Sequence, residues 1–240
     1  MRVWDIHPGY LSRQNLLGEH AEIHALYSII SHEKRGYYHH PETKRWIGYL
    51  DLLVLRHNLI VKELILRGHS HHSPLNFLDN LTIRNQASHN WFIDLPSRQF
   101  AILQEKYQKR RDQRGRIPLP AYGTEFWAHH KYSVMARGYQ YYKEIQNFLK
   151  NRINLPITKD DDLILKVLKL MGKPVSRVAL ENVILHLWGY FKSLANQEEK
   201  DIFFNLYVSK EKIKFLYQMS QKYQKTYLLH STIFADFIID

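Results

Sequence analysis

Apolar residues recur at spacings of three and four along most of the chain, which is the period of an amphipathic helix rather than of a strand. Strand-type alternation is scarce, and glycine and proline fall between the periodic blocks. We therefore predict an all-α fold. The expected helices span about residues 12–32, 41–67, 96–114, 124–151 and 158–171, and three more begin near residues 176, 196 and 209.

The residue types at the ends of these blocks support the boundaries. Ser12 suits an N-cap, Pro41 suits a first helical turn, and Gly68 suits the position after a C-cap. Asn196 followed by Glu199 resembles a capping box. The stretch 115–123 (GRIPLPAYG) contains two prolines and two glycines and is the best candidate for a linker. The sequence thus predicts two helical domains, residues 1–120 and 121–240.

Composition narrows the class of partner. Of the 240 residues, 34 are Lys or Arg and 23 are Asp or Glu, which gives a formal net charge of +11 and favours a polyanion as partner. Cysteine is absent, which excludes a thiolate nucleophile, a disulfide framework and a cysteine-ligated metal site. No apolar run reaches the roughly 18 residues of a membrane span. We expect a cytoplasmic protein with no membrane partner.

The absence of several common sequence motifs argues against several classes of enzyme. The P-loop, GxGxxG, HExxH and GxSxG patterns are all missing, so nucleotide-driven and serine-hydrolase chemistry loses its support. In the first helix, Asn15, Glu19 and Glu22 share one polar stripe, and Gly18 lies one turn before Glu22. A site that needs close backbone approach would justify a glycine there, which costs roughly 1 kcal/mol relative to alanine. The alternative is a solvated polar face with an incidental glycine.

Histidines gather in the first half of the chain. His20 and His24 lie one turn apart and are either a metal pair or two packed side chains. Two further clusters, residues 39–40 and 69–72, bracket the helix expected over 41–67. If that helix is straight, its ends are about 40 Å apart, so the two clusters do not share an ion. They suit capping or phosphate contacts better, and we expect neither a metal nor a cofactor.

A dense basic run follows in the third expected helix and just beyond it. It suits contacts to a phosphate backbone, with a solvated helix face as the alternative. Aromatic groups farther along the chain fit a core better than base stacking. The basic run comprises Lys106, Lys109, Arg110, Arg111, Arg114 and Arg116.

Several separated blocks in the first 95 residues resemble the pyrimidine dimer DNA glycosylase family, whose best-known member is phage endonuclease V. The matching stretches are residues 1–11 (MRVWDIHPGYL), 16–24 (LLGEHAEIH), 36–46 (GYYHHPETKRW) and 71–74 (HHSP). The resemblance implies an endonuclease V-like helical domain that needs no metal. It also implies a glycosylase with abasic-site lyase activity, in which the α-amine of Met1 forms a Schiff base with the sugar of a damaged nucleotide and β-elimination follows. Glu22 takes the place of the family's catalytic glutamate.

The implied partner is double-stranded DNA with damaged or abasic sites. The second residue is Arg2 where the phage enzyme has the threonine that methionine removal exposes, so the amine would belong to a retained Met1. Ala21 and Ala25 replace arginines that flank the phage glutamate, so DNA contacts must come from elsewhere. The lesion stays open. The residues expected to contact DNA are Arg2, Arg13, Gln14, His39, His40, Lys44, Arg45, Lys109, Arg110, Arg111 and Arg114.

The second half resembles a YbgA-type domain of unknown function, on residues 127–137 (WAHHKYSVMAR), 181–192 (ENVILHLWGYFK) and 227–230 (YLLH). That family implies a helical bundle without established chemistry, and its protein partner stays unknown. Two alternative functions remain open, a non-catalytic nucleic-acid binder and a metal-dependent hydrolase built on His20 and His24. The polar-site candidates of this half are His129, His130, Lys131, Arg137, His186 and Lys192.

Overall fold

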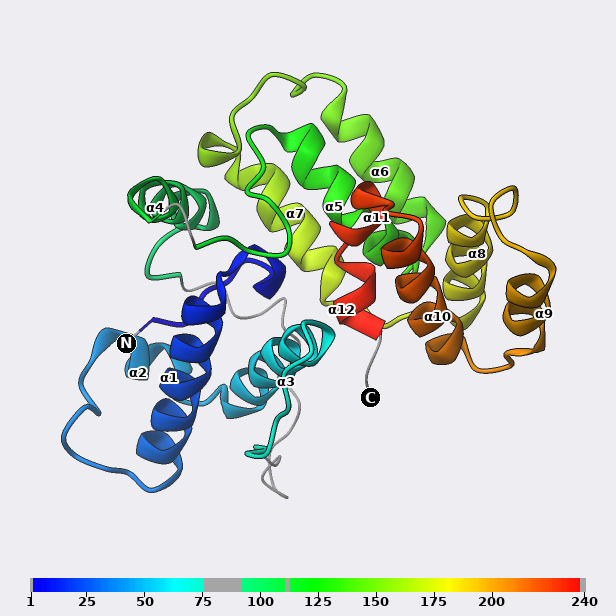
Figure 1. Ribbon diagram of the computed structural model, residues 1–240. Coiled ribbons are helices and arrows are strands. Elements are labelled where there is room, and N and C mark those ends of the chain that lie inside the picture. The colour runs from blue at the N-terminus through cyan, green and yellow to red at the C-terminus, as the bar shows by residue number, and fades with distance from the viewer. Residues whose placement is uncertain (1, 76–91, 111–112, 238–240) are drawn as a thin grey trace. The chain divides into compact units, whose positions relative to one another are not determined.

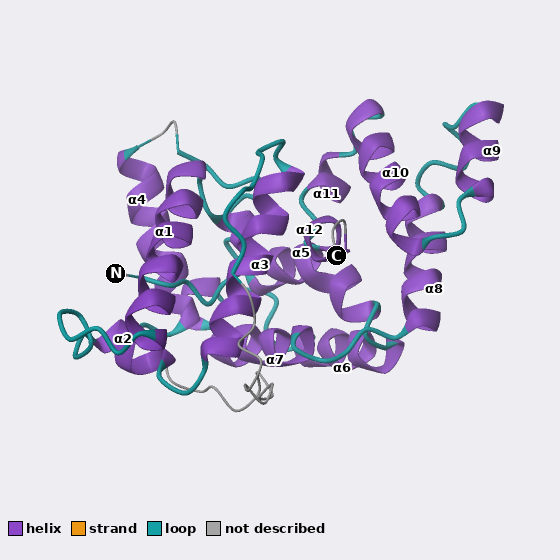
Figure 2. Cartoon of the chain, turned by 90° about the horizontal axis from the view of Figure 1, so that it is seen from below, coloured by secondary structure: helices purple, strands orange, loops and turns teal. Residues whose placement is uncertain are grey.

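The computed structural model describes residues 2–75, 92–110 and 113–237 (Figure 1). These residues form twelve α-helices and two short 3-10 helices joined by loops, and they contain no β-strand (Figure 2). The predicted all-α fold is therefore confirmed. None of the helices in this described part of the chain is long and apolar enough to cross a membrane.

The chain divides into two compact units, Met1–Leu119 and Pro120–Asp240. The first holds η1 (Pro8–Tyr10), α1 (Arg13–Ser31), α2 (Pro41–Trp46), α3 (Leu50–Leu66) and α4 (Pro96–Lys109). The second holds α5 (Gly123–Met135), α6 (Tyr139–Leu149), η3 (Ile157–Lys159), α7 (Asp161–Met171), α8 (Arg177–Trp188), α9 (Gln197–Asn205), α10 (Ser209–Lys222), α11 (Thr226–Leu229) and α12 (Ile233–Phe237).

Side-chain caps explain where several helices begin. The Ser12 hydroxyl accepts a hydrogen bond from the backbone N–H of Asn15, and Ser176 caps α8 in the same way. Asn196 and Glu199 exchange side-chain and backbone hydrogen bonds at the start of α9, which confirms the predicted capping box. The local signals in the sequence therefore placed these helix starts correctly.

Two expected helices are broken, and each break has a local cause. The helix expected over 41–67 is two helices, because Ile47 is extended and Gly48 has a φ of 80°, which glycine adopts without a steric cost. The helix expected over 124–151 stops at Met135 and resumes at Tyr139. There the Arg137 side chain bonds to the carbonyl of Ser133 and to that of Lys173 outside the helix.

The core of the first unit is built from α1, α3 and α4 together with the irregular segment before α1. Tyr10 is completely buried and meets Phe100 of α4 edge to face, with ring centroids 5.0 Å apart. On α1, Leu16 and Ile23 are fully buried, and α1 packs against α3 and α2. The segment before α1 is thus part of the core rather than a loose tail.

One buried carboxylate joins α3 to the segments at both ends of this unit. The oxygens of Glu63 accept hydrogen bonds from Arg67 at 2.8 Å and from Arg116 at 2.9 Å. Arg67 continues to the backbone carbonyls of Leu11 and Gly9, at 2.9 and 3.2 Å. Arg116, expected within the basic DNA-binding run, is therefore committed to packing.

This network predicts a large effect of Glu63→Gln. Removing the carboxylate leaves two guanidinium groups facing a neutral amide, and breaking a buried ion pair costs about 3–5 kcal/mol. We expect a loss of this size in the free energy of unfolding of the first unit, measured by urea denaturation. The matched control is Glu105→Gln, because the Glu105 side chain is 61% exposed and lies 3.7 Å from Arg98. Equal stability of the two variants would contradict the assignment.

The same pair of variants reports on pH. Burial alone would raise the pKa of Glu63, but Arg116 and Arg67 lower it below its ordinary value of 4.5. A depressed folded-state pKa adds stability that is present above pH 4.5 and is lost as the pH falls through the folded value. Glu63→Gln should therefore weaken the acid dependence of unfolding, whereas Glu105→Gln should keep it.

Candidate functional site

The first residues of the chain are held by a buried ion pair between α1 and α3. Arg56 makes two hydrogen bonds to the carboxylate of Glu19, at 2.8 and 2.9 Å. Glu19 also accepts the backbone N–H of Trp4 at 2.9 Å, and Arg56 donates to the carbonyl of Ile6 at 2.8 Å. The segment at the start of the chain is extended and belongs to no helix or sheet. Its backbone polar groups therefore take their hydrogen-bond partners from these side chains.

A second set of contacts holds the same segment from α2. Arg45 is 1% exposed and donates to the carbonyl of Val3 at 3.2 Å and to Glu42 at 3.0 Å, and it also forms an ion pair with Asp5. Gln99 of α4 accepts the backbone N–H of Asp5 at 2.8 Å and donates to its carboxylate at 2.7 Å. Residues 3–6 are therefore fixed from α1, α2, α3 and α4.

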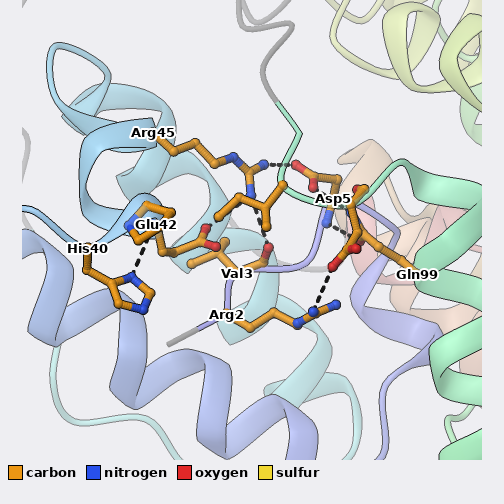
Figure 3. Close-up of a pocket in the computed structure, with 10 residues that line it drawn as sticks. Arg2, Val3, Asp5, His40, Glu42, Arg45 and Gln99 are labelled. Carbon is orange, nitrogen blue, oxygen red and sulfur yellow. Dashed lines mark hydrogen bonds and ion pairs between the residues drawn. The ribbon is translucent and has the colours of Figure 1, made fainter.

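A pocket of about 250 Å³ opens beside this anchored segment (Figure 3). Its most exposed cation is Arg2, whose side chain is 39% exposed, donates to Asp94 at 2.7 Å and lies over the Trp4 ring at 5.1 Å. The pocket combines cationic, acidic and amide groups at the beginning of the chain. It is lined by Arg2, Val3, Asp5, His40, Pro41, Glu42, Arg45, Ile93, Asp94 and Gln99.

The acidic groups near this segment differ in environment. Burial raises the pKa of Glu19 against the opposing effect of Arg56, and burial likewise raises the pKa of Glu42 against that of Arg45. Glu22 follows Glu19 by three residues on α1 and is half-buried. Met1, the expected nucleophile, lies outside the described residues.

The polar stripe of α1 is buried rather than solvated. Asn15 is 7% exposed and Glu19 is 2% exposed, so the solvated face considered from spacing does not describe these two residues. Gly18 faces outward, and a Cβ added there would meet no described atom within 4 Å. The packing of the described residues therefore does not require this glycine, and the close approach of a bound partner considered from the sequence stays a prediction.

The expected DNA contacts fall into different environments. Most are exposed, whereas His40 is half-buried and its Nδ1 accepts the backbone N–H of Glu42, which caps α2. Arg45 is buried and anchors the first residues, so its position differs from that of a surface contact. Arg111 lies outside the described residues. The exposed members are Arg13, Gln14, His39, Lys44, Lys109, Arg110 and Arg114.

The end of α4 is fastened to the beginning of α1. The Tyr107 hydroxyl donates to the carbonyl of Tyr10 at 2.9 Å and accepts the backbone N–H of Ser12 at 2.7 Å. Lys106 bonds to Asn15, and burial together with the charges of Arg110 and Arg2 lowers its pKa. We call the cations gathered by these contacts the basic face, which consists of Arg2, Arg13, Lys106, Lys109, Arg110 and Arg114.

Sequence reasoning missed the anchors Glu19, Arg56 and Gln99 as functional supports. The stripe that includes Glu19 was visible, but its partner Arg56 lies 37 positions away in the chain, and Gln99 lies 94 positions from its own partner Asp5. No local spacing connects residues at that separation. Only the packing of α1 against α3 and α4 shows that the acidic stripe anchors the first residues of the chain.

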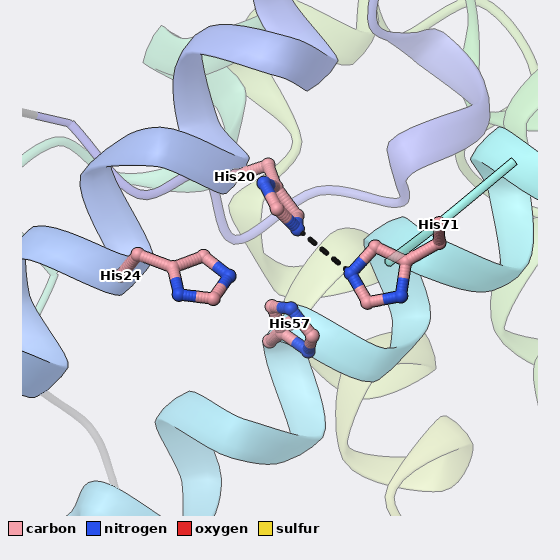
Figure 4. Close-up of side chains that lie close together, drawn as sticks. All are labelled: His20, His24, His57 and His71. Atoms are coloured by element: carbon pink, nitrogen blue, oxygen red, sulfur yellow. Dashed lines mark hydrogen bonds between the residues drawn. The ribbon is translucent and has the colours of Figure 1, made fainter. Parts of the chain in front are cut away.

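Four histidines of this unit also come together, although the sequence indicated at most a pair. They are His20 and His24 of α1, His57 of α3 and His71 beyond α3 (Figure 4). Their ring nitrogens are the only group in the described residues suited to hold a metal ion. His57 lies within the helix expected over 41–67 and His71 follows its end, whereas His39 and His40 are not part of this cluster.

The polar candidates of the second unit take several roles. His129 and His130 are buried in α5, and the carbonyl of His129 accepts the backbone N–H of Thr232 at 2.9 Å. Lys131 lies over the Tyr132 and Tyr227 rings at 4.7 and 4.9 Å. The other three candidates are Arg137, which packs as described above, and the exposed His186 and Lys192.

Comparison with known proteins agrees with both resemblances. Neither a curated protein nor a solved structure gives a significant match. Residues 131–237 match the model of a family described as a protein of unknown function (DUF1722). Residues 1–77 match the model of the pyrimidine dimer DNA glycosylase family, and this match supports a DNA glycosylase function at the level of the family for the first unit.

Proposed function

We propose that the first unit is a DNA glycosylase with abasic-site lyase activity that uses the α-amine of Met1 as nucleophile and Glu22 as its acid–base partner. The observation that carries the proposal is the anchoring of residues 3–6 by Glu19, Arg56 and Arg45. A chain terminus is ordinarily free to move, whereas a nucleophile must be held within about 3–3.5 Å of the atom it attacks. Four anchored residues directly behind the terminus remove most of that freedom.

The reach of the chain agrees with this pairing. The Trp4 backbone nitrogen is 2.9 Å from Glu19, and three residues of fully extended chain span at most about 10 Å. Glu22 lies one helical turn beyond Glu19, a rise of about 5 Å along α1. The α-amine of Met1 can therefore reach Glu22, because the span of the first three residues exceeds the distance along α1 from Glu19 to Glu22.

The chemistry uses a property that a lysine side chain lacks. An α-amine has a pKa of about 7.7–8.0, so a useful fraction is neutral near pH 7. Its lone pair attacks C1′, the glycosidic bond breaks, and the base leaves with the bonding electrons and a proton. Opening of the sugar gives a Schiff base, loss of a C2′ proton expels the 3′ phosphate, and water then releases the enzyme. Glu22 stabilises the cationic sugar and moves these protons.

The basic face supplies the means to hold the DNA strand. Arg13 lies in the first turn of α1 and Lys106 bonds to Asn15 of that turn, where the helix dipole also favours phosphate. Turning a damaged nucleotide out of the duplex costs a few kcal/mol, which contacts to the phosphates offset. The substrate proposed is double-stranded DNA with a damaged or abasic site, and the proposed location of the protein is the cytoplasm, in association with the nucleoid. We propose that residues 121–240 extend the DNA contact or bind a protein partner.

Borohydride trapping tests the nucleophile. Protein with a native Met1 should form a covalent adduct with DNA that contains an abasic site when sodium borohydride reduces the Schiff base, and a gel shift measures it. An uncleaved N-terminal extension should abolish the adduct, because the amine is then an amide. Mass spectrometry must show that Met1 is retained. Salt-sensitive DNA binding without an adduct would contradict the lyase mechanism and favour a non-catalytic nucleic-acid binder.

Glu22→Gln tests the acid–base partner. The amide keeps the size of the side chain but neither carries charge nor accepts a proton, so we expect strand cleavage to fall by about 10²–10⁴-fold. DNA affinity should change little. Glu33→Gln is the control, since Glu33 is exposed just beyond the same helix. Cleavage undiminished in Glu22→Gln would remove Glu22 from its proposed role.

Arg110→Ala tests the basic face. Loss of one phosphate contact should lower the slope of log affinity against log salt concentration by about 1, with little change in sequence preference. Fluorescence anisotropy on a labelled duplex at several salt concentrations measures this. Arg98→Ala is the matched control, because Arg98 is an exposed cation at the opposite end of α4. An identical slope change in both variants would show that the effect is one of net charge alone.

A further inference from the structure

Four imidazole rings from three separate places surround one small space in the first unit. His20 and His24 come from consecutive turns of α1, His57 comes from α3, and His71 comes from the non-helical segment after α3. One ring nitrogen of each lies within 4.8 Å of those of the other three. The ring centroids of neighbouring pairs are 4.6 to 5.2 Å apart, and Figure 4 shows the rings facing one another.

The hydrogen bonding of this cluster is incomplete. The Nε2 atoms of His24 and His57 are buried and have no hydrogen-bond partner among the residues that the structure describes. The Nε2 atoms of His20 and His71 face each other at 3.1 Å, so at most one of the two can donate. Buried polar atoms are nearly always paired, and leaving one unpaired costs about 1–3 kcal/mol. Several nitrogen lone pairs aimed into one space call for a cation.

The protonation of His57 is set from outside the cluster. Its Nδ1 lies 3.0 Å from the side-chain oxygen of Asn58, which can only accept a hydrogen bond. The proton therefore sits on Nδ1, and Nε2 presents its lone pair to the other rings. A hydrogen bond of this kind is what orients histidine ligands around metal ions.

Three of the four rings lie in an environment that disfavours a charge. Burial, and then the neighbouring His57, His24 and His71, lower the pKa of His20 to about 4. Burial lowers the pKa of His57 and of His71 as well.

We propose that His20, His24, His57 and His71 form a site for one divalent transition-metal ion, with Zn²⁺ the expected occupant. Four protein ligands are the complete set of a structural, tetrahedral zinc site, and imidazole nitrogens suit Zn²⁺ better than Mg²⁺ or Ca²⁺. Zinc–nitrogen bonds of about 2.0–2.1 Å place tetrahedral nitrogens about 3.3 Å apart. The Nε2 atoms of His20 and His71 are 3.1 Å apart, close to that spacing, and the ligand nitrogens of all four histidines lie within 4.8 Å of one another.

The proposed metal site lies on a different side of α1 from Glu22, so its role is structural rather than catalytic. Glu22 is two residues from both His20 and His24, a rotation of about 200°, so it projects from the opposite side of the helix. The ion would join α1, α3 and residues 69–75 on one side while the other side of α1 carries the acidic stripe. No step of the proposed strand cleavage passes through it.

Zinc retention by the full-length protein without a polyhistidine tag tests the site. After incubation with Zn²⁺ and gel filtration, elemental analysis should find about one zinc per chain in the wild type. His71→Ala should retain at least tenfold less. His72→Ala is the matched control, because His72 is the exposed neighbour of His71 and lies outside the cluster, and it should retain zinc like the wild type. Equal retention by His71→Ala and His72→Ala would overturn the proposal.

Two further readouts address geometry and folding. Co²⁺ in the same site should give the intense visible absorption of tetrahedral nitrogen coordination, which His71→Ala should lose; only the weak bands of octahedral Co²⁺ would overturn the proposal. Free Zn²⁺ about a hundredfold above its Kd should raise the melting temperature by about 5–10 °C in the wild type and in His72→Ala, but not in His71→Ala. An unchanged wild-type melting temperature would contradict a structural ion. None of these readouts depends on DNA cleavage.

Discussion

The buried pair of Glu19 and Arg56 is the interaction on which the first unit depends. Residues 3–6 form neither helix nor sheet, yet they lie in the core, so their backbone polar groups need partners from side chains. The pair supplies two, at Trp4 and Ile6. Replacing a buried pair by apolar residues is often neutral for stability, whereas removing one partner is costly. What this pair provides is a defined position for the beginning of the chain, which an apolar contact would not specify.

Several arginines are buried in ion pairs, so they do not contribute to the positive charge of the protein surface. Arg45, Arg56 and Arg116 are all committed to carboxylates in the packing. Since these cations are neutralised inside, the surplus of +11 belongs to other residues, among them those of the basic face. The sequence could not separate buried from exposed arginines, because Arg116 and Arg110 occur in one run. Only the contact of Arg116 with Glu63 of α3 distinguishes them.

Features that depend on near neighbours in the chain were predictable, and features that depend on packing were not. Caps at Ser12, Ser176 and Asn196 follow from side chains that bond to the backbone three residues ahead, and the helical period predicted the fold class. The breaks at Gly48 and Gly138 were missed, because apolar periodicity continues across both. The His20–His24 spacing was visible, but its completion by His57 and His71 required the antiparallel return of α3 beside α1.

α1 is the element in which these requirements meet. One side carries Asn15 and Glu19, which bind Lys106 and Trp4, and Glu22 continues that stripe. Another side carries His20 and His24, which face α3. An isolated helix of this length is marginal in water, and α1 contains a glycine that its own packing does not require. A reaction that needs an amine and a carboxylate in fixed relation therefore requires external restraint on α1 from both sides. The Glu19–Arg56 ion pair provides that restraint beside the anchored segment, and the histidine cluster is placed to provide a second connection to α3.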